Sequence, residues 1–211
     1  MIKILPLGNT VKQYLREWGE RTPRVLMDCP MCKQELWQHG SYRRWVAARR
    51  ERFLIPIYRL RCPHCRLTIS LLPPFLHPYA HFLTCTREAV ARLHFRRNLP
   101  LRQVAAMVAT GQVGCISERT LARWLKDIRE IARPVNALLA SKLLELAPGL
   151  DLPRYAAGPE TKQGPTKTLL ALCDLYRHLS MALGARAAAF SAGTFGLLNA
   201  RLLPTDTGQY L

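Results

Sequence analysis

Four of the seven cysteines occur as two Cys-x-x-Cys pairs. The first pair is Cys29 and Cys32, the second is Cys62 and Cys65, and 29 residues separate the pairs. Two intervening residues let both thiolates of a tight turn face one ion, and the proline inside each pair favours such a turn. Zinc binds four thiolates in a tetrahedral arrangement. The spacing therefore predicts one structural zinc ion per chain, whose full coordination shell leaves no position for catalysis.

Other roles for the cysteines are less consistent with this pattern. A redox pair of the thioredoxin type would need a βαβ pattern around one Cys-x-x-Cys, and neither pair has one. The only candidate for a substitute ligand is His39, seven residues after the first pair. The remaining cysteines lack ligand spacing, and we expect them to be core thiols: Cys85, Cys115 and Cys173.

The segment between the pairs must bring the two turns together. Residues 29–75 have the pattern of a β unit, with a polar and aromatic stretch at 36–45, an arginine-rich turn, and a strand at 53–58. Pro56 predicts an edge position for that strand, because proline cannot donate to a sheet. We expect a zinc ribbon, in which the metal compensates for a core too small to be stable alone.

Arginines are concentrated on this predicted hairpin and its turn. A turn is exposed, and a flexible cationic turn suits the phosphate backbone of DNA better than the base edges. The alternative is that these side chains only keep a small metal-held module soluble. The candidate phosphate contacts are Arg43, Arg44, Arg49, Arg50 and Arg52.

A helix-turn-helix pattern follows between residues 99 and 131. Pro100 begins a helix over 101–108, since proline is favoured in a first turn, and residues 110–114 form a glycine-containing turn. Ser117 then caps a second helix, with Glu118 placed to interact with the helix dipole. A segment at 86–95 predicts the supporting first helix of a three-helix unit.

The second helix of this pattern has an apolar and a basic face. Apolar residues at i, i+3, i+4 and i+7 face inward: Leu121, Trp124, Leu125 and Ile128. A basic outer face suits entry into the major groove, although a plain helical hairpin with a solvated face has the same periodicity. The candidate DNA contacts on this helix are Arg119, Thr120, Arg123 and Lys126.

The overall charge also indicates a polyanionic partner. The chain carries a formal net charge of +17 over 211 residues. Residues 29–99 alone contain 13 Lys and Arg against 3 Asp and Glu, so most of the excess lies in the segment that holds the paired cysteines. A basic surface of this size is typical of nucleic-acid binding.

Neither a secretory signal nor a membrane span is visible. The first ten residues lack a long apolar run, and the most apolar stretch, 169–183, is interrupted by charged residues. We expect a cytoplasmic, nucleoid-associated protein, in which reduced cysteines bind metal rather than form disulfides.

These patterns divide the chain into four parts. An N-terminal segment, 1–28, contains a short helix at 11–18; the zinc ribbon spans 29–80 and the helix-turn-helix spans 84–134. Residues 135–211 form a helical C-terminal region with a Pro- and Gly-rich linker at 148–165 and an apolar helical part at 166–203. The predicted fold class is α+β, mostly α.

Taken together, the motifs resemble proteins of bacterial insertion elements that begin with a zinc ribbon followed by a helix-turn-helix. The likeness covers about residues 25–134. Its motifs are the two cysteine pairs, the segments around them at 39–44, 59–61, 67–68, 71–76 and 78–79, and the helix-turn-helix segments 101–105 and 117–125. The resemblance implies binding of DNA at element ends, with a transposase or another mobile-element protein as a further partner.

The C-terminal region departs from that family. Such transposases carry an RNase H-like domain with three metal-binding carboxylates, whereas residues 135–211 are too few for that domain and lack its strand pattern. We therefore expect a DNA-binding or regulatory protein and not an enzyme. Two alternatives stay open: a non-catalytic subunit of a transposase or nuclease complex, and an adaptor whose zinc ribbon binds protein.

Overall fold

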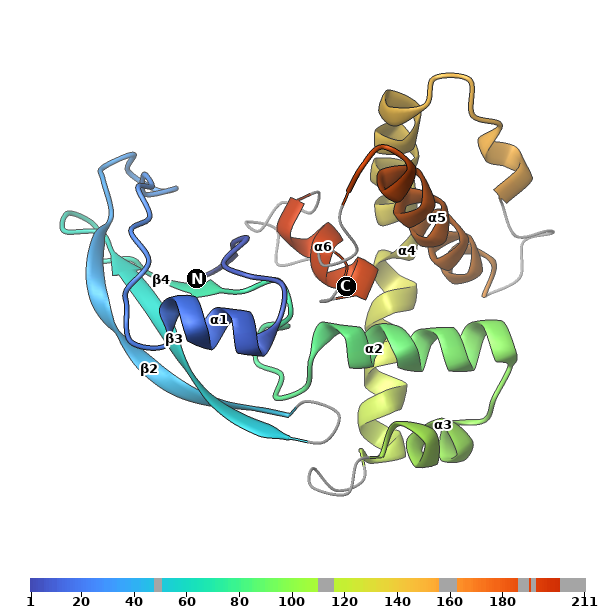
Figure 1. The fold of residues 1–211 in the computed structure, drawn as a ribbon, viewed down its shortest axis with the longest axis horizontal. Helices are drawn as coiled ribbons and strands as arrows, with labels where there is room; N and C mark the ends of the chain where they lie inside the picture. The colour runs from blue at the N-terminus through green and yellow to red at the C-terminus, as the bar shows by residue number, and fades with distance from the viewer. Residues whose placement is uncertain (48–50, 110–115, 156–162, 186–189, 191–192, 202–211) are drawn as a thin grey trace.

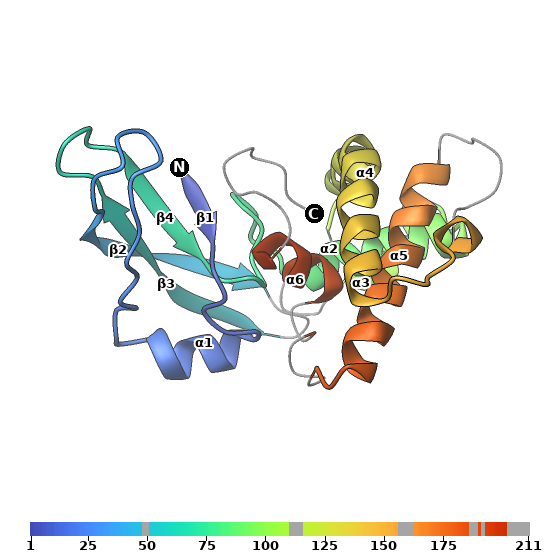
Figure 2. The ribbon, with the colours of Figure 1, turned by 90° about the horizontal axis from the view of Figure 1, so that it is seen from above.

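The protein consists of a sheet part followed by a helical part (Figure 1). The computed structural model describes residues 1–47, 51–109, 116–155, 163–185, 190 and 193–201. The strands lie within residues 2–72 and the helices after residue 83, apart from one N-terminal helix. Seen from above, the two parts stand side by side (Figure 2). This segregation of strands and helices confirms the predicted α+β class.

The sheet has four strands in the order β1-β4-β3-β2. They are β1 Ile2–Ile4, β2 Trp37–Ala47, β3 Arg52–Arg61 and β4 Thr68–Leu72. β2 and β3 form the long antiparallel hairpin that the sequence predicts between the cysteine pairs. A bulge interrupts its register between Gln38 and Ser41, where Gly40 takes a φ of +73° that suits glycine. β1 pairs with β4 in parallel, a contact that the sequence did not indicate.

The prediction that the strand around Pro56 is an edge strand is wrong, because β3 lies between β2 and β4. The proline is nevertheless tolerated for a local reason. β4 pairs only with residues 58–61 of β3, so Pro56 has a strand neighbour on the β2 side alone. Its carbonyl accepts a hydrogen bond from the Tyr14 hydroxyl at 2.7 Å.

The N-terminal helix α1, Val11–Trp18, has the bounds that the sequence predicts. The Thr10 hydroxyl accepts a hydrogen bond from the Gln13 amide and caps its first turn. Two tyrosines attach the helix to β3: Tyr14 donates to Pro56, and Tyr58 donates to the Trp18 carbonyl. Burial raises the pKa of Tyr14. The helix thus covers one face of the sheet.

The helical part begins with α2, Thr84–Ala91, which continues as the π-helical segment η1, Arg92–Arg96. The other helical elements are α3 Leu101–Val108, α4 Glu118–Leu146, the 3-10 segment η2 Leu152–Tyr155, α5 Gly164–Ala182 and α6 Gly193–Arg201. They enclose a separate apolar core, in which Phe95 and Leu125 are almost fully buried. No helix in the described part of the chain combines the length and apolarity needed to cross a bilayer.

Helix α4 is a single helix of 29 residues. The predicted boundary between residues 134 and 135 therefore falls inside a helix. Pro134 lies in its interior and is exposed, so its ring faces solvent. Val135, Leu139 and Leu143 are buried in the helical core beyond the proline, and this packing outweighs the hydrogen bond that the proline removes.

The C-terminal region is helical, as predicted, but its linker is shorter than expected. Pro165 lies in the first turn of α5, so the linker ends at residue 163, and η2 occupies part of it. Residues 156–162 of the linker lie outside the described residues. α6 packs against α2, where the Glu88 carboxylate accepts a hydrogen bond from the Phe195 amide at 3.0 Å.

Candidate metal centre and nucleic-acid interface

Each cysteine pair lies in a turn with the same backbone geometry. In the first turn, Lys33 donates its amide to the Cys29 carbonyl at 2.9 Å; in the second, Arg66 donates to the Cys62 carbonyl at 3.1 Å. Lys33 and Arg66 both have a φ of 61°, in the left-handed region. Each chain reversal is then closed by a second hydrogen bond, which the amide of the first cysteine donates to a carbonyl five residues on. The two turns are therefore equivalent knuckles.

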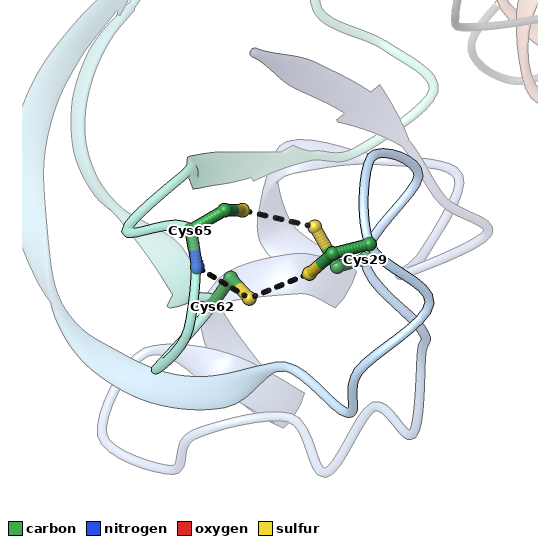
Figure 3. Close-up of side chains that lie close together, drawn as sticks. Cys29, Cys62 and Cys65 are labelled. Atoms are coloured by element: carbon green, nitrogen blue, oxygen red, sulfur yellow. Dashed lines mark hydrogen bonds between the residues drawn. The ribbon is translucent and has the colours of Figure 1, made fainter.

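The two knuckles bring four thiols into one cluster (Figure 3). All four sulfurs lie within 4.8 Å of one another, and Cys29–Cys65 and Cys32–Cys62 are each separated by 3.4 Å between Sγ atoms. A zinc ion about 2.3 Å from each thiolate would place the sulfurs about 3.8 Å apart in a tetrahedron. The cluster therefore has the ligand number, ligand type and approximate size of a site that holds a metal ion.

The protein environment favours the thiolate at one of these positions. Burial raises the pKa of Cys62, but hydrogen bonds from the amides of Cys65 and His64 and from neighbouring thiols outweigh burial and lower that pKa to about 6. The Cys65 amide is 3.4 Å from the Cys62 sulfur. A thiolate is the form that binds metal, and Cys62 is the member of the cluster for which that form is favoured without a metal; the pKa values of Cys32 and Cys65 are raised.

The remaining candidate ligands do not join the cluster. His39 is exposed in the bulge of β2, and the metal-binding group found among the described residues consists of the four cysteines alone. Cys173 is fully buried in the helical core, as predicted for a core thiol, and Cys85 is half-buried on α2. Cys115 lies outside the described residues.

The first turns of α4 have the two faces that the sequence predicts. The Ser117 hydroxyl accepts a hydrogen bond from the Thr120 amide at 3.2 Å, so the helix starts where the serine cap is expected. The four apolar residues of the inner face are buried: Leu121, Trp124, Leu125 and Ile128. Arg119, Arg123 and Lys126 are exposed. Their cationic groups are thus accessible to a ligand outside the protein.

Thr120 and Lys126 also have partners within α4. The Thr120 hydroxyl lies 3.0 Å from that of Ser117, so it belongs to the helix cap. Lys126 forms an exposed ion pair with Glu130 at 3.7 Å, which contributes little stability and can be exchanged for another anion. Among the candidate contacts on α4, the two arginines are therefore the most available.

α2, α3 and α4 pack together as three helices. α3 has the bounds that the sequence predicts for the first helix of the motif. The buried Arg87 of α2 forms an ion pair with Asp127 of α4 at 3.1 Å, and burial lowers the pKa of Arg87 to about 10. Residues 110–114, the predicted glycine-containing turn between α3 and α4, lie outside the described residues.

The arginines of the hairpin divide into exposed and anchored side chains. Arg43 and Arg52 are exposed. Arg44 instead is half-buried and donates hydrogen bonds to the carbonyls of His77 and Ala80, so part of its guanidinium is already engaged within the protein, and its contact with phosphate stays a prediction. Burial lowers its pKa. Arg49 and Arg50 lie outside the described residues.

Arg43 faces a groove that the sequence did not reveal. The groove, of about 550 Å³, lies between the end of α1 and the hairpin and is also lined by Arg16 and Arg21. Among the described residues that line it, Glu20 is the only carboxylate. Arg16 and Arg21 belong to the N-terminal segment, whose small net charge did not indicate a basic surface. Only the packing of α1 on the sheet brings them beside Arg43.

Figure 1 shows the far ends of β2 and β3 next to the helical part, on the side where α4 begins. The Ala47 amide donates to the His81 carbonyl at 2.7 Å. The ring of Phe82, the next residue, packs edge-to-face against Trp124 with centroids 5.5 Å apart. One short segment therefore links the end of the β2–β3 hairpin to the inner face of α4.

Comparisons with known proteins find one similar family. Residues 29–124 match a family described as "Domain of unknown function (DUF6431)". The matched region begins at the first cysteine of the cluster and ends at Trp124 of α4. The knuckles, the hairpin and the start of α4 therefore fall together within the matched region. No curated protein and no solved structure matches the chain.

Proposed function

We propose that this chain is a zinc-stabilised, sequence-specific DNA-binding protein of a mobile element, acting at element ends or as a regulator. The cysteine cluster is then the zinc site of a ribbon. Helices α2, α3 and α4 form a helix-turn-helix in which α4 is the recognition helix. The likeness of the motifs to insertion-element proteins supports the mobile-element context.

The link between the hairpin and α4 is the observation that carries this proposal. Ala47, Phe82 and Trp124 connect the tip of a basic hairpin to the beginning of a helix whose outer face is basic. Two cationic elements held at fixed relative positions suit the regular array of phosphates on duplex DNA. The start of α4 would enter the major groove, and the hairpin arginines would contact the phosphates beside it.

The exposed side chains of α4 fit different parts of that task. Arg119 and Arg123 lie one turn apart near the helix start, and arginine reads guanine through two hydrogen bonds to its major-groove edge. Lys126, one turn further along, suits a phosphate as a point charge. The groove arginines Arg16, Arg21 and Arg43 would extend the phosphate contacts.

Two acidic residues of the C-terminal region, Glu145 and Asp174, are held in ion pairs. Both carboxylate oxygens of Asp174 bind arginines, with Arg92 at 2.7 Å and Arg96 at 2.5 Å. Glu145 forms an ion pair with Lys142. These two carboxylates stabilise the helical part and are not gathered with others into a metal-binding group in the described part of the chain.

Selection of bound DNA from a random pool by the zinc-loaded chain tests the proposal directly. A preferred sequence that matches the termini of the neighbouring element would support binding at element ends, and one that matches a promoter would support regulation. Recovery of random sequences by the intact chain would overturn sequence-specific binding.

The phosphate contacts are tested by the salt dependence of binding to the selected site. The triple variant Arg49→Ala, Arg50→Ala, Arg52→Ala should reduce the log–log salt slope by about one unit for each phosphate contact that it removes, with the preferred sequence unchanged. Arg154→Ala is the control, because this exposed arginine belongs to η2, the short orange segment that Figure 1 shows away from the hairpin. An unchanged slope in the triple variant would place the hairpin tip outside the DNA interface.

Two protein-binding roles are the alternatives. Exposed tryptophans on the hairpin favour the adaptor, since Trp37 and Trp45, on opposite faces of β2, are 65% and 56% exposed. A non-catalytic subunit of a transposase or nuclease complex would instead need a carboxylate-bearing partner encoded by a neighbouring gene. Binding of the selected DNA by the isolated chain, with a strong salt dependence, would favour the leading proposal over the adaptor.

A further inference from the structure

Two aromatic rings lie open to solvent on one face of the sheet, one at the first residue of β2 and one near the middle of that strand. Trp37 and Tyr42 of β2 are 65% and 39% exposed. Their cross-strand partners in β3 are Arg61 and Ile57, which are four residues apart and therefore point to the same side. The rings share that face and are separated by about 13 Å along the strand, at about 3.3 Å per residue.

Two arginines occupy the same face beside these rings. Arg61 lies opposite Trp37, and the guanidinium carbon of Arg59 is 5.8 Å from the centroid of the Tyr42 ring. Within the described residues neither arginine forms an ion pair with a carboxylate. The Nε of Arg59 is buried without a hydrogen-bond acceptor. The face therefore alternates aromatic planes with uncompensated positive charge.

The strands of the sheet carry charge of one sign. All four together contain five arginines and one lysine, and no aspartate or glutamate. An acidic protein surface could neutralise these charges, but its carboxylates would not stack on aromatic rings that are exposed at intervals. A single-stranded nucleic acid offers both matching features, because it presents free base faces and a phosphate for each base.

We propose that this face is a binding site for single-stranded DNA, in which Trp37 and Tyr42 each stack on a base and Arg59 and Arg61 bind the intervening phosphates. Duplex DNA does not fit, because its bases are already stacked on one another. The site is distinct from the outer face of α4 and does not depend on duplex recognition there. The separation of the rings means that the stacked bases are not neighbours in the strand.

Binding of a fluorescent twelve-residue oligothymidylate to the zinc-loaded full chain, measured by anisotropy, tests this site. Trp37→Ala and Tyr42→Ala should each weaken binding about 5- to 100-fold, the range expected when one stacked base is released. Trp37→Phe should retain most of the affinity, because a phenyl ring still stacks. The matched control is Trp45→Ala: Trp45 is 56% exposed on the same strand, but it pairs with Leu54 and so lies on the opposite face.

The same variants are also measured with the duplex selected by the chain, with zinc content and circular dichroism confirming that each is folded. Trp37→Ala should leave duplex affinity unchanged, and Arg123→Ala should leave oligothymidylate affinity unchanged. The single-strand site and the duplex site are therefore tested independently. The inference is overturned if the intact chain does not bind oligothymidylate, if Trp45→Ala weakens binding as much as Trp37→Ala, or if Trp37→Ala weakens duplex and single-strand binding equally.

Discussion

The residues of the cysteine cluster show how a short pattern specifies a local structure. Both knuckles place a basic residue, Lys33 or Arg66, in the left-handed conformation directly after the second cysteine. That conformation costs about 1 kcal/mol or more for a residue other than glycine, so something must hold it. Four thiolates around one ion would do so, since the ion draws the two sulfurs of each knuckle together.

Cys62→Ser should abolish metal binding, because it removes a buried ligand from the centre of the cluster. The intact chain should contain one zinc ion, and the variant close to none, with residues 29–75 unfolded as a consequence. Metal analysis and amide hydrogen exchange measure the two effects. Cys85→Ser, which lies outside the cluster on α2, is the control and should keep its zinc. Purified intact protein without zinc, prepared in the absence of chelator, would contradict the prediction.

Arg43 and Arg44 are neighbours in the sequence with opposite roles in the structure. Arg44→Ala should lower the free energy of unfolding by about 1.5–3 kcal/mol, because it removes charged hydrogen bonds to two backbone carbonyls. Arg43→Ala should leave stability within about 0.5 kcal/mol and weaken DNA binding instead. Urea unfolding and DNA titration of both variants separate the effects. Equal stability of the two variants would show that the Arg44 hydrogen bonds contribute nothing.

At the scale of elements, α4 combines two tasks in one helix. Its first three turns bury an apolar face against α2 and α3 and expose a basic face. Beyond Pro134 its buried residues pack within the core that it shares with α5. A long helix anchored in this way presents its first turns rigidly, which the proposed reading of base edges would require.

Arg123→Ala should cost about 1–3 kcal/mol on the cognate site and relax the preference at one base position. The physical reason is the removal of paired hydrogen bonds to a base from an exposed side chain near the helix start. Competition titrations with single-base variants of the site provide the measurement. Arg133→Ala, an exposed arginine further along the same helix, is the matched control. An effect that is equal on cognate and random DNA would identify Arg123 as a phosphate contact.

At the scale of the whole molecule, two apolar cores lie on either side of a narrow connection. One core is formed by the sheet, α1 and the knuckles, and it contains Cys29 and Cys62; the other is formed by the helices after residue 83. Phe82 and α6 join them, since Ala200 of α6 packs on the sheet core while Phe195 belongs to the helical core. A metal ion held by the cysteine cluster would stabilise only the first core directly.

Chelation should therefore unfold the sheet part and leave the helical part largely folded. Most of the ellipticity at 222 nm should persist after zinc removal, because α2 to α5 keep their own buried core. Limited proteolysis should then cleave within the first 83 residues, and DNA affinity should fall as the hairpin unfolds. Circular dichroism before and after chelation, with zinc restored as the control, checks this. A complete disappearance of helix on chelation would show that the two parts unfold as one unit.

Local features of the fold followed from the sequence because their causes act over a few residues. The bounds of α1 and α3, the Ser117 cap and the buried face of α4 depend on capping groups and on the 3.6-residue period. The spacing of the cysteines likewise predicted one cluster of four, since two residues between the members of a pair specify a knuckle. The hairpin between the pairs followed from the turn and the strand at residues 53–58.

Contacts between distant segments were decided only by the tertiary structure. The sequence could not show that Arg44 binds the loop at residues 77–80, that β1 pairs with β4, or that α1 places Arg16 beside Arg43. An exposed and an anchored arginine have the same sequence signature, and they differ only in which carbonyls the fold brings within reach. By itself the sequence determined which residue types and spacings could carry the proposed chemistry; the packing of the sheet, α1 and α4 decided which of those side chains are exposed.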